Sequence, residues 1–446
     1  MQTKGVDEVQ HPIEVETGFV GQFRKGVGWY VYPTTRFKTI TLQAFWINEL
    51  DPNTAALGAL LPHVLKRGTV SWPDSVAIEK QLESLYGASF RADVGKIGDK
   101  QLISISLEVI HGQYLPGEPD TLHAGLGFLD EVLNRPRVDH ADQFDPEYVS
   151  QEKELLRRQI HALINDKGQY AMQRLIETMA DGRPFGLRKV GQPKDVERAT
   201  PQSLFAYYDQ VRHQSPFVLL AVGDVEPETI AAYVDQHWAG PRTTLQSIVP
   251  YAPHHQDYEV VDRQPVQQGK VNLGYWTRRT LTSRDYPALM MYAGVLGGFA
   301  HSKLFVNVRE KASLAYYAYA RLDAALGFMV VGAGIEFQDY QAVKDIIAEQ
   351  LDAMRRGDIT DQEMTFTRQA FQNDILSEED LPHQLIGRQM EKLLLGGGLT
   401  GETLITALEA VTVPDIQRVA EDILLDTVFF LTTDGSAGRE TTHTDE

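Results

Sequence analysis

The chain has 446 residues, of which 43% are hydrophobic, and its 42 lysines and arginines oppose 61 aspartates and glutamates, which gives a net charge of −19. This length exceeds what one hydrophobic core supports, so two to four domains are expected. The acidic balance argues against nucleic acid or an anionic membrane as a partner, and the absence of cysteine excludes disulfides, thiolate metal ligands and cysteine nucleophiles.

The beginning of the chain predicts a cytoplasmic protein. Its first residues are polar and lack the apolar centre of a signal peptide, and no run in the chain approaches the roughly 18 apolar residues of a membrane span. Two runs rich in β-branched and aromatic residues follow, at residues 28–32 and 39–47. Such runs predict strands.

Residues 53–69, NTAALGALLPHVLKRGT, have the pattern of an inward-facing helix. Asn53 or Thr54 can cap its start, leucines recur at helical spacing, and Gly68 suits the left-handed position that ends many helices. Pro62 lies inside this helix, where its ring and its missing N–H cost about 3 kcal/mol unless a kink absorbs them. The sequence therefore tolerates a disruption at this point.

The rest of the first half alternates helices with strands. Strands at residues 89–94 and 101–110, joined by a turn at 95–100, are expected to form an antiparallel meander. Further helices are expected at residues 75–86, 122–133, 146–165, 173–179, 201–211 and 226–238, and a further strand at 217–225.

The second half repeats the first in outline, which is the strongest organisational signal in the chain. Its strands are expected at residues 271–277, 315–322 and 327–335, and its helices at 286–296, 302–311, 340–355 and 361–377. The helix and strand that close the first half return at residues 412–435. We therefore divide the chain into an N-terminal segment, a first domain, a linker, a second domain and a disordered tail, at residues 1–17, 18–238, 239–257, 258–435 and 436–446.

The buried helix with its histidine and the following K-R-G-T resembles the start of the insulinase/pitrilysin-type metallopeptidases, the inverzincins, whose helix carries H-x-x-E-H before K-G-T. Aligning residues 67–69 on that motif places His63 on the second histidine, Ala59 on the first and Pro62 on the glutamate general base. Alanine cannot ligate zinc and proline cannot accept a proton from water. The resemblance therefore supports the fold and argues against the chemistry.

The family takes its third zinc ligand from a later helix, and the helix at residues 146–165 resembles it. Glu152 matches the start of that motif, and seven residues later, where the family has the ligating glutamate, this chain has Gln159. The stripe that contains Glu152, Leu155 and Gln159 is expected to face inward. Glutamine is a poor zinc ligand, so the resemblance implies that this chain binds no metal.

Two alternatives remain for His63. One is a rewired metal site in which it joins Glu152 or Glu154, although a stable zinc site usually needs three or four ligands. The other is an ordinary hydrogen-bonded core histidine. The other histidines show no ligand spacing, and the pair His254-His255 is expected to be solvated in the linker.

The second half keeps more of the family pattern. GGFAHSKLFVNVREKASLAYYAYA resembles the C-terminal signature, whose arginine and tyrosine fall on Arg309 and Tyr316. Both can donate hydrogen bonds to a peptide carbonyl as negative charge develops on its oxygen. The alternative is structural: Arg309 pairs with Glu310 or Glu152, and Tyr316 packs on the sheet. Ser313 stands where the family has glycine, and residues 299–301 replace a small serine-rich turn.

The resemblance spans roughly residues 18–435 and implies a mitochondrial-processing-peptidase-like α+β fold, with two homologous mixed α/β domains that form a clamshell around an extended peptide. Some members divide the zinc motif and the Arg/Tyr pair between two related chains. We therefore expect a non-catalytic partner subunit that binds peptide and presents Arg309 and Tyr316 to a zinc-bearing homologous subunit. A pure peptide-binding scaffold and a zinc peptidase with atypical ligands are the alternatives. The YfmF-type bacterial branch, associated by name with the aminopentanol modification of elongation factor P, shows a similar L-P-x-V-L-x-R-G-T.

Overall fold

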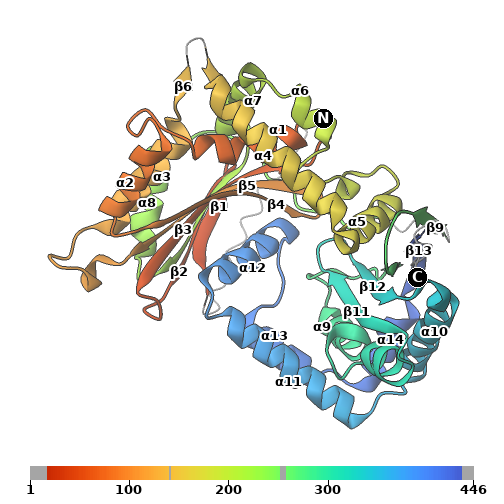
Figure 1. Cartoon of the computed structure of the whole chain (residues 1–446). Coiled ribbons are helices and arrows are strands. Elements are labelled where there is room, and N and C mark those ends of the chain that lie inside the picture. The colour runs from red at the N-terminus through yellow and green to blue at the C-terminus, as the bar shows by residue number, and fades with distance from the viewer. Residues whose placement is uncertain (1–17, 140–141, 252–257, 434–446) are drawn as a thin grey trace, which may run out of the picture.

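The computed structural model describes residues 18–139, 142–251 and 258–433, and in this part of the chain each half builds its own β-sheet (Figure 1). In spatial order, the first sheet contains β1 (Val20–Arg24), β2 (Val27–Pro33), β8 (Phe217–Gly223), β3 (Thr39–Glu49), β5 (Lys100–Ile110) and β4 (Ser89–Ile97). The second contains β11 (Ala315–Asp323), β12 (Phe328–Ile335), β10 (Gly269–Trp276), β13 (Leu424–Thr432) and β9 (Tyr258–Arg263).

Helices follow the strands in the same order in both halves. The first half has α1 (Ala55–Leu65), α2 (Ser75–Ser84), α3 (Thr121–Asn134), α4 (Pro146–Asn165), α5 (Lys167–Ala180), α6 (Pro193–Arg198), α7 (Pro201–Gln214) and α8 (Pro227–His237). The second has α9 (Tyr286–Ala293), α10 (Tyr340–Arg356), α11 (Asp361–Glu378), α12 (Pro382–Leu395), α13 (Gly401–Glu409) and α14 (Val413–Glu421), with π-helical turns η3 (Gly294–Gly298) and η4 (Phe305–Lys311). A small hairpin of β6 (Val138–Asp139) and β7 (Gln143–Phe144) precedes α4.

Five strands of the first sheet share the topology of the second, and β1 adds a sixth strand antiparallel to β2. In the first, β3 pairs antiparallel with both β5 and β8, β4 pairs antiparallel with β5, and β2 lies parallel to β8. In the second, β10 pairs antiparallel with both β12 and β13, β11 with β12, and β9 lies parallel to β13. The prediction of a duplicated α+β architecture is therefore confirmed.

Successive side chains of the central strands point to opposite faces of the sheet, which explains how the two halves pack. On β3, Leu42, Ala44 and Trp46 enter the core beneath the first half's own helices, whereas Phe45 and Ile47 enter a separate core on the opposite face. This separate core also contains Trp276 and Phe328 of the second sheet. The inner faces of both sheets therefore contribute to one shared hydrophobic cluster.

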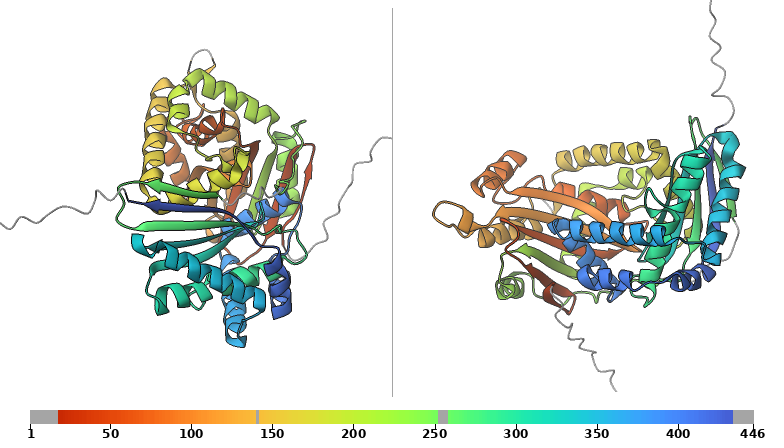
Figure 2. Two further views of the ribbon diagram at one scale, coloured as in Figure 1. Left: turned by 90° about the vertical axis from the view of Figure 1, so that its right-hand side faces the viewer. Right: turned by 90° about the horizontal axis from the view of Figure 1, so that it is seen from below.

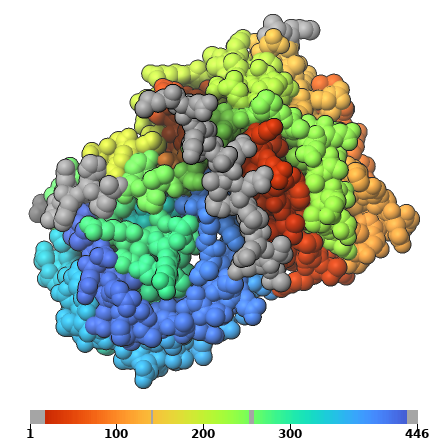
Figure 3. Space-filling model, turned by 180° about the vertical axis from the view of Figure 1, so that it is seen from behind, coloured from red at the N-terminus to blue at the C-terminus, as the bar shows by residue number. Residues whose placement is uncertain are grey.

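Two helices that the sequence did not delimit build this shared core. The α5 helix belongs to the first half but packs on β10 and β13 of the second sheet, and α12 belongs to the second half but packs on β3 and β8 of the first (Figures 1 and 2). Their buried residues include Leu175 and Met179 on α5 and Ile386 and Met390 on α12. This exchange of helices joins the two lobes that the space-filling view shows from behind (Figure 3).

Several local predictions differ from the structure. The expected turn at residues 95–100 is only Gly98 and Asp99, because pairing continues to Ile97 opposite Lys100. The expected helices at 286–296 and 302–311 become π-helical in η3 and η4. The described part of the linker, residues 239–251, is tied down, since the Ile248 N–H donates to the Leu394 carbonyl over 2.8 Å.

Some predictions lie outside the described residues. These are the His254-His255 pair, the whole of the expected disordered tail and the whole of the N-terminal segment. None of the helices in the described ranges has the length and apolar character needed to cross a membrane.

Candidate functional site

The helix α1 presents the residues that align with the metal motif. Ala59 is fully buried, Pro62 is buried, and His63 is half-buried and makes no hydrogen bond within the described part of the chain. The core-histidine alternative, which expects a hydrogen bond, is therefore not supported. The helix ends at Leu65 with Lys66 as its C-cap, so Gly68 lies beyond the left-handed position that the sequence suggested.

Glycine is needed at residue 68 for a different structural reason. Its φ angle is not positive, and a Cβ atom there would lie 2.7 Å from the Pro73 carbonyl oxygen. Glycine is needed because the backbone passes so close to residue 73. The prediction of a left-handed helix end at Gly68 was wrong.

Helix α4 turns a different stripe inward from the one expected. Its buried residues are Val149, Glu152, Leu156 and Ile160, at spacings of three and four residues. Leu155 is 50% exposed, and Gln159 is exposed as well. The prediction that the Glu152–Gln159 stripe faces inward was correct for Glu152 and wrong for Leu155 and Gln159.

A salt bridge that the sequence did not reveal joins α4 to the end of α1. Both Nε and Nη2 of Arg67 contact Oε1 of Glu152, whose side chain is 9% exposed. The Arg67 guanidinium also lies 5.8 Å from the centre of the Tyr148 ring. Arg67 thus supplies the positive charge that a nearly buried carboxylate requires. The partners are 85 positions apart in the sequence, which left no sequence signal for this pair.

These residues do not fit a zinc ion. Zinc needs at least three imidazole, thiolate or carboxylate donors, and the described residues hold no group of three or more such side chains. Of the carboxylates in the rewired alternative, Glu152 is taken by Arg67, and Glu154 accepts hydrogen bonds from Arg157 and Arg158, which lower its pKa. We therefore derive no chemical step through a metal on this chain.

Arg309 and Tyr316 lie on adjoining elements of the second half. Arg309 is exposed on the π-helical turn η4, where its guanidinium lies 4.6 Å from the centre of the Phe305 ring, and no ion pair to it exists among the described residues. Tyr316 is 72% exposed at an irregularity in the register of β11 with β12. Both π-helical turns and bulges recur at functional sites. The structural alternative, with Arg309 paired to an acid and Tyr316 packed on the sheet, is not found.

The turns before and after η4 explain the family signature. A Cβ at Gly297 would lie 2.5 Å from the Ala320 backbone nitrogen, so glycine lets η3 approach β11. Ser313 adopts a left-handed backbone with φ of +56°, the conformation for which glycine is best suited. His301, in the altered turn, stacks on Phe299 and shares a 3.0 Å hydrogen bond with Thr367.

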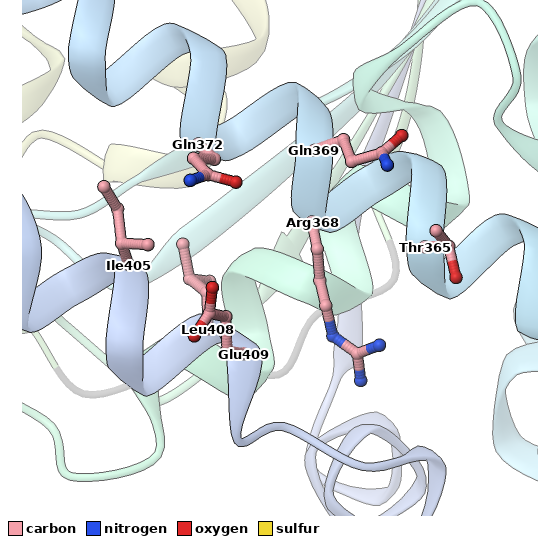
Figure 4. Close-up of a pocket in the computed structure, with 7 residues that line it drawn as sticks. All are labelled: Thr365, Arg368, Gln369, Gln372, Ile405, Leu408 and Glu409. Carbon is pink, nitrogen blue, oxygen red and sulfur yellow. The ribbon is translucent and has the colours of Figure 1, made fainter.

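A small cavity of about 180 Å³ lies between α11 and α13 (Figure 4). Thr365, Arg368, Gln369 and Gln372 line it from α11, and Ile405, Leu408 and Glu409 from α13. Arg368 is already engaged, because it donates a 2.7 Å hydrogen bond to the Val411 carbonyl. The cavity contains no histidine and lacks a metal-ligand set.

Comparison with known proteins agrees with this degenerate site. A family model described as "Peptidase M16 inactive domain" matches residues 198–371. The chain is also 36% identical over 411 residues to "Probable inactive metalloprotease YmfF" of Bacillus subtilis, covering 91% of this chain and 96% of the relative. The chain belongs to the M16 peptidase family. This is the insulinase-type family that the sequence predicted, and the altered metal motif marks the chain as a degenerate member.

Solved M16-like structures have the same architecture. A conserved protein from Enterococcus faecalis V583 superposes with a TM-score of 0.87 at 29% identity, over 95% of this chain and 100% of that one. A peptidase M16 inactive domain from Pseudomonas fluorescens gives a TM-score of 0.76 at 16% identity, over 93% and 98% of the two chains. The two-domain M16 fold is thus confirmed.

Proposed function

We propose that this M16 chain is the non-catalytic partner of a zinc-bearing M16 homologue, and that Arg309 and Tyr316 hold a peptide carbonyl during cleavage on that partner. The observation that carries the proposal is the contrast between the two candidate sites. The metal motif is filled by buried Ala59 and Pro62, whereas the Arg/Tyr pair is exposed and free of ion pairs in the described structure. Because the Arg309 guanidinium is exposed and makes no ion pair in the described part of an acidic chain, it is available to a ligand.

The chemistry of the pair suits carbonyl stabilisation. Hydrolysis of a peptide places negative charge on the carbonyl oxygen, and donors at 2.7–3.1 Å from that oxygen stabilise it, by about 10²–10³ in rate for one donor. Arg309 offers several N–H donors and Tyr316 one O–H donor. The zinc-activated water and its general base belong to the partner in this proposal. Peptide binding and a cytoplasmic location are parts of the same proposal.

The experiment mixes this chain with the zinc-bearing homologue from the same genome and measures cleavage of a fluorogenic peptide library. We expect the pair of chains to cleave at least one member, and Arg309→Ala and Tyr316→Phe to lower kcat by about tenfold to a thousandfold. Arg284→Ala and Tyr258→Phe are matched controls, because Arg284 is exposed and Tyr258 is 39% exposed outside this site. Unchanged cleavage in both site variants would refute the role of the pair.

Gel filtration and metal analysis separate the alternatives. A scaffold without hydrolysis retains peptide but gives no cleavage with the homologue. A zinc peptidase with atypical ligands carries one equivalent of zinc and cleaves without a partner. The association with elongation factor P stays a prediction, to be checked by whether the modification persists in cells that lack the chain.

A further inference from the structure

A row of glycines on β12 lets two tyrosine rings lie flat on the second sheet. Tyr317 and Tyr319 of β11 are the cross-strand neighbours of Gly334 and Gly332. A Cβ at Gly334 would lie 2.6 Å from the Tyr317 ring, and one at Gly332 would lie 2.5 Å from the Tyr319 ring. The rings therefore occupy the space that side chains on β12 would fill, and they stack with centroids 6.0 Å apart.

A cation lies at each end of this tyrosine pair. Lys270 of β10, which also pairs with Gly334, reaches across it so that its Nζ lies 5.1 Å from the centre of the Tyr317 ring. The Arg321 guanidinium lies 4.9 Å from the centre of the Tyr319 ring. The order along the sheet is lysine, tyrosine, tyrosine, arginine. The Lys270 ammonium donates a hydrogen bond to the side-chain oxygen of Gln268, and neither cation makes an ion pair with any residue in the described ranges, although the chain has a net charge of −19.

These four side chains form one wall of a cavity of about 600 Å³, and the first turns of α5 form the other. This volume lies within the usual range for ligand sites. The one acidic lining residue is Asp166, whose carboxylate is already the N-cap of α5 and accepts from the N–H groups of Gly168 and Gln169 at 3.0 and 3.1 Å. Burial lowers the pKa of Lys270, which Asp166 partly offsets. An anion bound in the cavity would favour the charged form of Lys270 and so raise its pKa again.

We infer that this groove, formed by Lys270, Tyr317, Tyr319 and Arg321 against α5 and called the β11 groove below, binds an extended acidic peptide with a carboxylate at each end of the tyrosine pair. The inference rests on the peptide-binding role proposed above and names the class of peptide. Charge-assisted hydrogen bonds fix the two carboxylates, and the rings contact the side chains between them.

The spacing favours a peptide over a small dianion. Residues 317 and 321 are four apart on a strand, so the backbone positions of Tyr317, beside which Lys270 lies, and of Arg321 are separated by roughly 13 Å. An extended peptide repeats at the same rise, so glutamates with three residues between them match these two positions. In addition, β11 is the edge of its sheet, so its outer backbone groups can pair with an added strand.

The test uses fluorescence anisotropy with a labelled, C-terminally amidated peptide in which three β-branched residues separate two glutamates. We expect the matched glutamine peptide to bind the wild-type chain at least about tenfold more weakly. Lys270→Gln and Arg321→Gln should each weaken binding of the glutamate peptide without affecting the glutamine peptide. Lys344→Gln is the control, because Lys344 of α10 pairs with Glu259 of β9, at the other edge of the sheet. Equal affinity for the two peptides would overturn the inference.

Two further peptides test the site in more detail. A glutamine peptide with a free C-terminus shows whether the terminal carboxylate can replace one side chain. A peptide with adjacent glutamates should bind more weakly than the spaced one if both cationic ends are used. Binding that does not depend on this spacing would contradict the two-ended site.

The failure of this inference is distinguishable from the failure of the proposed function. Arg309→Ala should leave the preference for glutamate unchanged, since it lies outside the β11 groove. If cleavage with the homologue proves independent of Arg309 while the preference persists, the proposed role of Arg309 fails and the groove stands. If cleavage depends on Arg309 and the preference is absent, the groove is refuted and the partner role stands.

Discussion

The guanidinium of Arg67 contacts the nearly buried carboxylate of Glu152, and this pair connects the end of α1 to α4 beside the altered metal motif. Arg67 belongs to the K-R-G-T sequence that revealed the family, and Glu152 aligns with the start of the third-ligand motif. A permanent side-chain cation thus neutralises the acid at the position that aligns with the start of this motif. The Arg67–Glu152 salt bridge therefore has a structural role that does not require a bound metal ion.

Arg67→Met should destabilise the first half, because it leaves the Glu152 charge without a partner. Breaking one side of a buried pair costs about 3–5 kcal/mol, and the 26% exposure of Arg67 places the expected loss at the lower end. Urea unfolding followed by tryptophan fluorescence measures it, since Trp29, Trp46 and Trp72 all lie in this half. The double variant Arg67→Met/Glu152→Gln should recover part of the loss. A loss in the double variant as large as the sum of the single losses would show that the two residues are not coupled.

The wild-type chain should hold zinc only at substoichiometric levels after dialysis against the metal. The described structure holds no group of three or more histidine, aspartate or glutamate side chains that could bind a metal ion, and Glu152 is paired with Arg67. Mass spectrometry of the metal content measures the occupancy, and the zinc-bearing homologue serves as the positive control. One equivalent of zinc that disappears in His63→Ala would contradict this prediction.

Much of the fold could be predicted from the sequence, because hydrophobic periodicity is a local property. Most strands of the two sheets and most helices follow from patterns within 10 to 20 residues, whereas β1 and β9 were not predicted. The helix α12 was not predicted, although Ile386, Met390 and Leu394 recur every four residues and Pro382 marks its start. That signal was available. What the sequence could not show is that α5 and α12 each pack on the opposite sheet.

The candidate site was harder to predict because it depends on contacts between distant segments. A spacing of seven residues places Glu152 and Gln159 near one stripe, but the rotation of α4 about its axis depends on what packs against it. The structure buries Leu156 and Ile160 instead. The β11 groove was likewise not expected, since it depends on glycines of β12 lying beside tyrosines of β11.

Ser313→Gly should stabilise the turn that precedes Tyr316. A non-glycine residue at φ of +56° costs roughly 1–2 kcal/mol, whereas glycine adopts this conformation freely. The greater flexibility of glycine in the unfolded chain offsets part of this, so we expect a net gain of about 0.5 kcal/mol in the free energy of unfolding. Ser313→Val should destabilise the turn by a larger amount. A chain that Ser313→Gly destabilises would show that the serine hydroxyl has a role of its own.

The stability of the protein should depend on pH through Lys96, which lies near the end of β4. Its ammonium group donates hydrogen bonds to the carbonyl oxygens of Phe185 and Leu187, and burial lowers its pKa to about 8, an effect that nearby Asp323 partly offsets. In the unfolded chain a lysine keeps its proton to about pH 10.4. Between these two values the unfolded state binds more protons, so this contribution to stability rises with pH.

The measurement compares urea unfolding of the wild type with that of Lys96→Met at pH 7.5, 9 and 10. We expect the wild type to gain about 2 kcal/mol relative to the variant over this range, because its lysine loses the cost of carrying a buried charge. Contributions from tyrosines cancel in the difference between the two proteins. The control Lys194→Met removes an exposed lysine and should show no such trend. A constant difference between wild type and Lys96→Met at all three pH values would mean that Lys96 keeps an ordinary pKa in the folded protein.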